Sequence, residues 1–132
     1  MKISYFFKAL VIFLLMDFIW LNYIGKSWYQ HYYGEFLGQP LMIQSWYAVI
    51  ISYLLIVIGL SIFIISNYNK SFLEPLLYGG LYGVCLYGVF NYTNMAILPN
   101  WNIFISIIDT LWGGFVCGVT AMLVYFINKY VF

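Results

Sequence analysis

The sequence contains no arginine, and charged residues make up only 7% of its 132 positions. Soluble globular domains carry about 25% charged residues, so this chain has too little charge to cover a water-facing surface. All five basic residues are lysines, which excludes the bidentate binding of phosphates by guanidinium groups. The net charge of +1 offers no basic patch for nucleic acid. We therefore expect neither a soluble domain nor a nucleic-acid partner.

Metal-binding and redox residues are also scarce. The two cysteines, Cys85 and Cys117, lie inside apolar segments, where thiols behave as small hydrophobic side chains. His31 is the only histidine, and it lies among aromatic residues typical of the headgroup layer of a membrane. No zinc-site spacing, phosphate-binding loop or Ser/His/Asp arrangement is present. The sequence predicts no disulfide, metal or cofactor, and it identifies no catalytic residue.

Apolar residues fill most of the chain, with 65% of positions hydrophobic and 23% aromatic. A helix rises about 1.5 Å per residue, so about 20 apolar residues cross the ~30 Å hydrocarbon core of a bilayer. Pro99 separates the last two apolar segments, because proline interrupts a helix. We predict an all-α membrane protein in which residues 1–132 form a single domain of four transmembrane helices, at about Ser4–Ile24, Gln44–Ser66, Phe72–Leu98 and Trp101–Asn128.

The segment from Gly25 to Pro40 mixes tyrosines and Trp28 with sparse charge. This composition is typical of the membrane interface, and it predicts a short interfacial helix after the first span. Four spans leave both ends of the chain on one side, and four of the lysines fall on that side, whereas only Lys26 falls on the other. The positive-inside rule then predicts that both termini are cytoplasmic.

Costly polar side chains interrupt three of the four predicted spans. An aspartate near the centre of a span costs about 2.5–3.5 kcal/mol on insertion scales, so two of them need partners or a function. Helix rise places all of these groups in the half of the bilayer away from the chain ends. We predict one shared site that binds a ligand or a proton, formed by Asp17 and Trp20, Asn91 and Asn94, and Asp109 and Trp112.

A purely structural role is the alternative for the same residues. Each tryptophan follows its aspartate by three positions, so both side chains share one helix face. The carboxylates can accept hydrogen bonds from indole groups or from the asparagine amides, and such a network holds helices together without any further function. The sequence leaves both interpretations open.

Three ordered strings resemble the signature segments of a known family: Met16–Leu21, Asn91–Asn94 and Ile108–Gly113. They are similar to a predicted membrane-protein family of mainly bacterial origin, the domain-of-unknown-function family numbered 2177. The resemblance covers nearly the whole chain and implies a small protein with four spans and no established activity. It departs at Asn91, where the family pattern has an aspartate, so a role that needs a third carboxylate is not expected here.

The leading functional hypothesis is the binding or translocation of a small solute or a proton, with Asp17 and Asp109 as the switchable groups. Two alternatives remain open. One is an intramembrane enzyme acting on a lipid or isoprenoid, in which an aspartate serves as general acid. The other is a structural or assembly subunit. Membrane lipids are the expected partners, and a small-molecule ligand and a homo-oligomer are left open.

Overall fold

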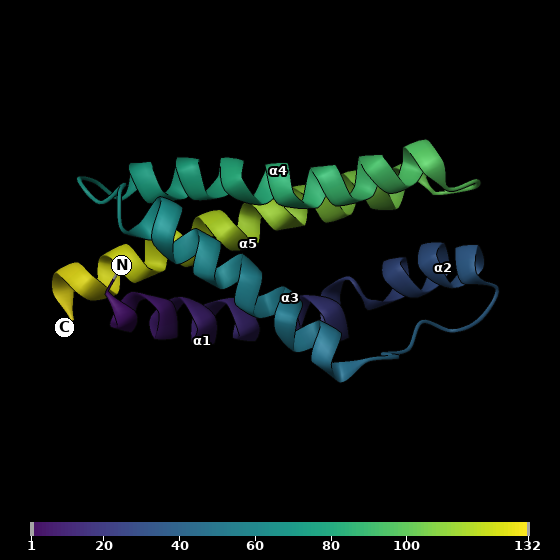
Figure 1. Cartoon of the computed structure of the whole chain (residues 1–132), viewed down its shortest axis with the longest axis horizontal. Helices are drawn as coiled ribbons and strands as arrows, with labels where there is room; N and C mark the ends of the chain where they lie inside the picture. The colour runs from purple at the N-terminus through teal and green to yellow at the C-terminus, as the bar shows by residue number, and fades with distance from the viewer. Residues whose placement is uncertain (1, 132) are drawn as a thin grey trace.

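The chain folds into helices joined by short connections in the computed structural model, which describes residues 2–131 (Figure 1). Four helical stretches are long and apolar enough to cross a membrane. They are α1 (Ile3–Ile19) with η1 (Trp20–Ile24), α3 (Trp46–Gly59) with η2 (Leu60–Ile65), α4 (Leu73–Ile97) and α5 (Ile103–Tyr130). The prediction of an all-α protein with four such helices is confirmed.

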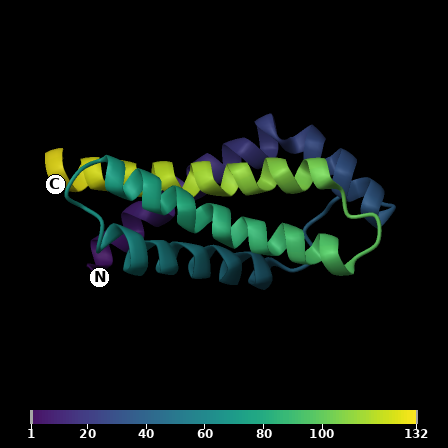
Figure 2. The same cartoon turned by 90° about the horizontal axis from the view of Figure 1, so that it is seen from above.

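Figures 1 and 2 show α4 and α5 side by side and antiparallel. Helix α1 packs against α5, and η2 packs against both α4 and α5, whereas α3 diverges from α4 and packs against α1. Both ends of the chain lie at the same end of the bundle. The shared core is mainly aliphatic, whereas many large apolar side chains lie on the outer surface. Its fully buried members include Phe13, Val57, Leu60, Val116 and Val124.

Glycines bring α4 and α5 into close contact. A Cβ atom on Gly83 would collide with the backbone carbonyl of Gly113, and one on Gly118 would lie 2.7 Å from the carbonyl oxygen of Leu76. Small residues at this interface let the backbones approach where lipid supplies no hydrophobic drive. The Gly79–Gly83 and Gly114–Gly118 spacings therefore pack the two helices together.

The connection between α4 and α5 lies where Pro99 predicts it. Leu98 is extended, with φ −106° and ψ 128°, as expected for a residue before proline. Asn100 adopts a left-handed φ of 64°. The side chain of Asn102 then caps α5 by accepting hydrogen bonds from the N–H groups of Phe104 (2.7 Å) and Ile105 (3.3 Å).

The segment after the first span folds as α2 (Lys26–Leu37), which ends at Gly38 with a left-handed φ of 71°. It follows the π-helical turn η1, in which the N–H of Gly25 donates to the carbonyl of Trp20 (2.7 Å). Helix α2 packs against α5 toward the end of the bundle that lies far from the chain termini, and the hydroxyl of Tyr33 reaches Asn91 on α4 (Figure 1). This docking directs two of its tyrosines toward the polar residues of the bundle.

Candidate functional site

Asp17 is buried on α1 and accepts hydrogen bonds from two other helices. The indole N–H of Trp112, on α5, donates to its Oδ1 at 2.9 Å. The hydroxyl of Tyr53, on α3, donates to its Oδ2. The carboxylate therefore joins three helices, and both of its oxygens have a donor.

Asp109 is buried on α5 and accepts from a different pair of donors. The hydroxyl of Tyr29, on α2, donates to Oδ1 at 2.6 Å, and the amide of Asn91, on α4, donates to Oδ2 at 2.7 Å. Asn91 is fully buried, and its amide also donates to the carbonyl of Tyr87 (2.8 Å). Its oxygen accepts from the hydroxyl of Tyr33 (3.1 Å). The side chain of Asn91 therefore bonds to α5 and α2 as well as to the backbone of its own helix.

Trp20 and Trp112 connect the two acidic centres. Their rings stack with centroids 4.5 Å apart and an interplanar angle of 6°. The indole N–H of Trp20 donates to the hydroxyl of Tyr29 (3.0 Å), which in turn donates to Asp109. A continuous set of contacts therefore links Asp17 to Asp109.

Gly25 makes room for this connection. A Cβ atom at this position would lie 2.9 Å from the Trp20 ring and 3.0 Å from the Tyr29 ring. Such distances are too short for real contacts, so only glycine lets the turn between the first span and α2 hold these two rings together. The position is a conformational requirement of the site rather than a flexible joint.

Two tyrosines of α2, Tyr29 and Tyr33, are held in their neutral form. Burial raises the pKa of the Tyr29 phenol above its ordinary value, and the nearby charge of Asp109 raises it further. The pKa of Tyr33 is raised for the same two reasons, burial first. Both phenols therefore act as proton donors to the cluster at neutral pH. The hydrogen bonds described for the two carboxylates all come from uncharged donors.

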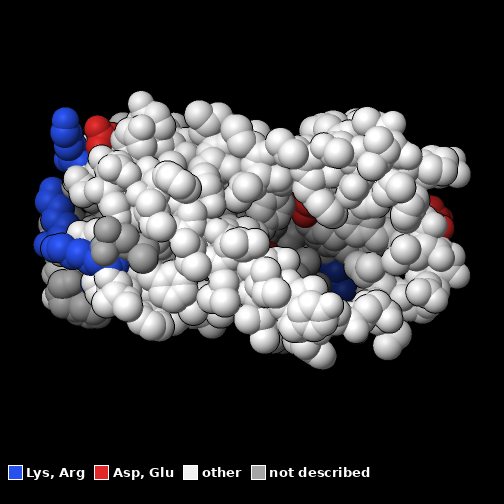
Figure 3. All heavy atoms as spheres, viewed as in Figure 1, with Lys and Arg blue, Asp and Glu red and all other residues white. Residues whose placement is uncertain are grey.

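Both carboxylates line a groove of about 660 Å³ between α3 and α4. Figure 3 shows acidic atoms at the bottom of a hollow on the face seen in Figure 1. The walls are mainly apolar, and several wall residues, such as Leu55 and Phe90, are exposed on the surface that faces lipid in a membrane protein. The lining residues are Asp17, Leu21, Ile43, Ala48, Val49, Ser52, Tyr53, Leu55, Ile56, Leu86, Tyr87, Phe90 and Asp109.

The structure brings together five of the six residues that the sequence singled out. Asp17 and Trp112 form one half of the cluster, and Asp109, Asn91 and Trp20 form the other through Tyr29. Asn94 is half-buried, and within residues 2–131 no hydrogen bond joins its side chain to this network. It lies one helical turn beyond Asn91 on α4.

Three tyrosines of the network were not predicted as site residues: Tyr29, Tyr33 and Tyr53. Tyr29 and Tyr33 are four residues apart, so they share one face of α2. That spacing is a signal in the sequence, but a segment whose tyrosines lie in the lipid headgroup layer has the same composition. Among the described residues 2–131, no group of three or more His, Cys, Asp or Glu is arranged to hold a metal ion.

Comparison with known proteins identifies a family but no activity. No curated protein matches the chain, and no solved structure matches it. A family model described as "Predicted membrane protein (DUF2177)" matches residues 2–126, which is nearly the whole sequence. This match agrees with the resemblance carried by the Asp17, Asn91 and Asp109 segments. The chain therefore belongs to this family of integral membrane proteins of unknown function.

Proposed function

We propose that the protein binds a small solute in the groove between α3 and α4 and exchanges protons at Asp17 and Asp109. One observation carries this proposal: two buried carboxylates line a mainly apolar groove of about 660 Å³. Ligand sites typically measure about 300–1,000 Å³ and combine apolar walls with a few oriented polar groups. Acidic side chains inside membrane spans commonly mark substrate or proton pathways.

The environment of the acids supports proton exchange as the coupled event. Their hydrogen-bond partners in the cluster are phenol, indole and amide groups, which carry no charge. A carboxylate in such surroundings changes its affinity for a proton when a charged or polar solute arrives or leaves. Binding of solute and binding of proton are then linked through the same two side chains.

The orientation that we propose places both termini in the cytoplasm. Lys2, Lys8, Lys70 and Lys129 lie at the end of the bundle that holds both chain ends, and Lys26 lies at the other end. The excess of lysine marks the cytoplasmic side of membrane proteins. In this orientation the groove opens in the half of the bilayer away from the cytoplasm.

The experiment begins with mass spectrometry of small molecules that leave with the purified protein. A molecule found in this way is then added back in weakly buffered detergent solution while proton release is measured. We expect wild type to bind it with a change in bound protons, and Asp109→Asn to lose that change. Glu74→Gln, which alters an acid remote from the groove, is the matched control.

A structural role predicts a different result from the same variants. Each carboxylate oxygen already has a donor, so a network that holds the helices together and has no other role is also consistent with these hydrogen bonds. In that case Asp109→Asn changes stability, while solute binding and proton release do not depend on Asp17 or Asp109. A lipid that co-purifies with the protein and has an altered mass would instead favour an enzyme acting on a lipid or isoprenoid. The apolar walls of the groove suit an acyl chain.

A further inference from the structure

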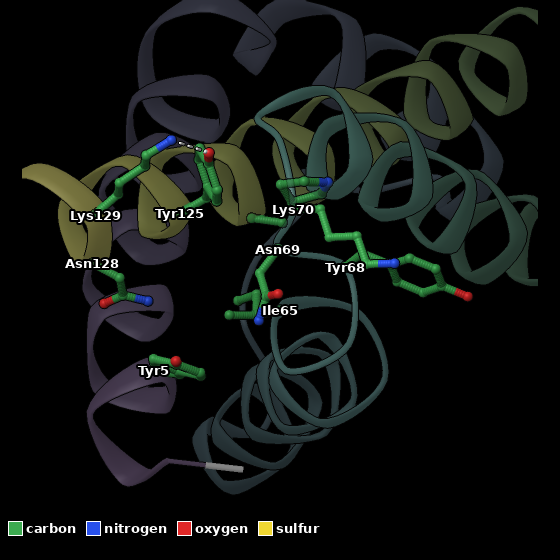
Figure 4. A pocket seen from close by; sticks show the side chains of 10 residues that line it. Tyr5, Ile65, Tyr68, Asn69, Lys70, Tyr125, Asn128 and Lys129 are labelled. Atoms are coloured by element: carbon green, nitrogen blue, oxygen red, sulfur yellow. Dashed lines mark hydrogen bonds between the residues drawn. The ribbon is translucent and has the colours of Figure 1, made fainter.

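A second pocket, of about 240 Å³, lies at the end of the bundle where the two ends of the chain meet. It is separate from the acidic cluster, which lies toward the opposite end. Its walls come from the start of α1, the end of η2 with the loop that follows, the first turn of α4 and the last turns of α5. Figure 4 shows its lining residues, which are Tyr5, Ile65, Tyr68, Asn69, Lys70, Pro75, Ala121, Tyr125, Asn128 and Lys129.

The floor of this pocket is apolar and its rim is polar and basic. Ile65, Pro75 and Ala121 are buried at the floor, whereas Lys70 and Lys129 are exposed on the rim. In Figure 4 the two lysines lie on opposite sides of the pocket, Lys129 beside Tyr125 and Lys70 with its side chain extended outward past Tyr68. The ammonium group of Lys129 donates to the hydroxyl of Tyr125 at 3.1 Å, which holds it beside the pocket.

The surrounding charge is strongly positive for so apolar a protein. Four of the five lysines lie at this end, and Figure 3 shows blue side chains gathered at one end of the molecule. One of them, Lys8, donates to the side-chain oxygen of Asn128, a lining residue (2.6 Å). The acid at this end is Glu74, which accepts from the backbone N–H of Lys70 (3.1 Å). Among residues 2–131, this end of the bundle therefore carries four lysines and one acid.

We propose that this pocket binds a phosphate group, carried either by a lipid headgroup or by a soluble molecule. Lysine binds phosphate as a compact point charge and does not need the planar fork of arginine. The volume is below the range of about 300–1,000 Å³ typical of sites for whole drug-sized ligands, so it suits a single headgroup-sized moiety. The asparagine amides and tyrosine hydroxyls of the rim supply neutral donors for the remaining phosphate oxygens.

Helix ends act on this site in opposite directions. Pro75 belongs to the first turn of α4, and the N-terminal end of a helix favours an anion. The C-terminal end of α5 carries the opposite partial charge and disfavours an anion. Lys129, in the last turn of α5, offsets that effect at the place where it arises.

The pocket lies at the ends of the apolar spans, which is the level of lipid headgroups. A lipid phosphate reaches it from within the membrane surface, and a soluble phosphate reaches it from water. Two probes distinguish these sources: inorganic phosphate, measured by calorimetry, and phosphatidylglycerol in mixed micelles with phosphatidylcholine, measured by native mass spectrometry. Both experiments use the full chain.

The test compares wild type with the double variant Lys70→Gln/Lys129→Gln, and Lys26→Gln at the other end is the matched control. A lysine near a membrane surface contributes roughly fivefold to anion affinity, so we expect the double variant to lose about 25-fold. Both lysines are exposed, so the melting temperature should be unchanged. Tyr125→Phe, which frees Lys129 but keeps its charge, should lose less.

Each outcome decides the proposal. Loss of phosphatidylglycerol binding alone identifies a lipid headgroup as the source of the phosphate. Loss of inorganic phosphate binding as well shows that the phosphate group is sufficient. The proposal is overturned if wild type binds neither probe, if the double variant binds both as well as wild type does, or if Lys26→Gln loses as much as the double variant.

Discussion

Trp20 and Trp112 stack on each other with ring centroids 4.5 Å apart, although they lie on antiparallel helices at opposite ends of the sequence. Each belongs to an Asp-x-x-Trp string, and each serves the acid of the other string. Trp112 donates directly to Asp17, and Trp20 reaches Asp109 through the hydroxyl of Tyr29. Direct contacts between side chains therefore connect the two acids.

Asp109→Asn should destabilise the protein less than Asp109→Leu. The asparagine oxygen still accepts from Tyr29, but its amide nitrogen faces the amide nitrogen of Asn91, so one hydrogen bond is lost, at about 1 kcal/mol. Leucine leaves two buried donors without an acceptor, at about 1–3 kcal/mol each. Unfolding in mixed detergent measures both variants. Equal losses would contradict the network described here.

Tyr29→Phe should cost about 1–3 kcal/mol of unfolding free energy, because it leaves the indole N–H of Trp20 without an acceptor and Oδ1 of Asp109 without a donor. Tyr32→Phe on the same helix is the matched control. Within the described residues, the hydroxyl of Tyr32 makes no hydrogen bond, and its ring packs against His31. The expected effect of the control is close to zero, and similar losses in both variants would show that the bridging hydroxyl has no special role.

Alkaline pH should destabilise the protein through Tyr29 on α2. The pKa of Tyr29 is raised in the folded state by burial and by Asp109, so above pH ~10 the unfolded chain releases a proton that the folded chain keeps. The stability that Tyr29 provides is then fully present below pH ~10 and falls as pH rises, by about 1.4 kcal/mol per pH unit. Tyr29→Phe should flatten the alkaline slope by this amount in unfolding curves. An unchanged slope would mean that Tyr29 titrates alike in both states.

Much of the fold follows from the length of the apolar segments and from residues that end a helix. The four apolar stretches and the break at Pro99 were predictable because a bilayer fixes helix length and proline removes a backbone donor. The π-helical turns η1 and η2 were not, since Trp20–Ile24 and Leu60–Ile65 read as ordinary apolar helix. Their wider turns arise from tertiary packing, which no local pattern encodes.

The acids of the site were predictable, but their partners were not. The cost of an aspartate in a span points to Asp17 and Asp109 wherever the helices pack. Identifying Tyr53 or Tyr29 as donors requires knowing which helices are neighbours. Asn94 illustrates the same limit: its polarity and its place one turn from Asn91 suggested a shared site, but no hydrogen bond within residues 2–131 joins its side chain to Asp109.

Gly83→Ala should be much more harmful than Gly80→Ala, three residues away on the same helix. A Cβ on Gly83 meets the backbone of Gly113, which cannot move without shifting α5, and overpacking of this kind costs about 1–3 kcal/mol or more. A Cβ on Gly80 has its nearest neighbour, the carbonyl oxygen of Gly114, at an ordinary 3.6 Å. Alanine in the middle of a helix is also more stable than glycine by about 0.5–1 kcal/mol. Melting temperatures should therefore fall for the first variant and stay level or rise for the second.

Ser27 and Ser71 should lie on opposite sides of the membrane. Both are exposed; Ser27 lies in the first turn of α2, and Ser71 lies in the loop before α4. The proposed orientation puts Ser71 beside the cluster of lysines in the cytoplasm.

Each serine is replaced by cysteine in a background lacking Cys85 and Cys117, and a membrane-impermeant maleimide is applied to intact spheroplasts. Cysteine at position 27 should react at once, and cysteine at position 71 only after the membrane is opened. The reverse order would invert the orientation and place the acidic groove in the cytoplasmic half of the bilayer. Reaction of both from one side would contradict the four-span arrangement itself, because α3 must carry the chain across between them.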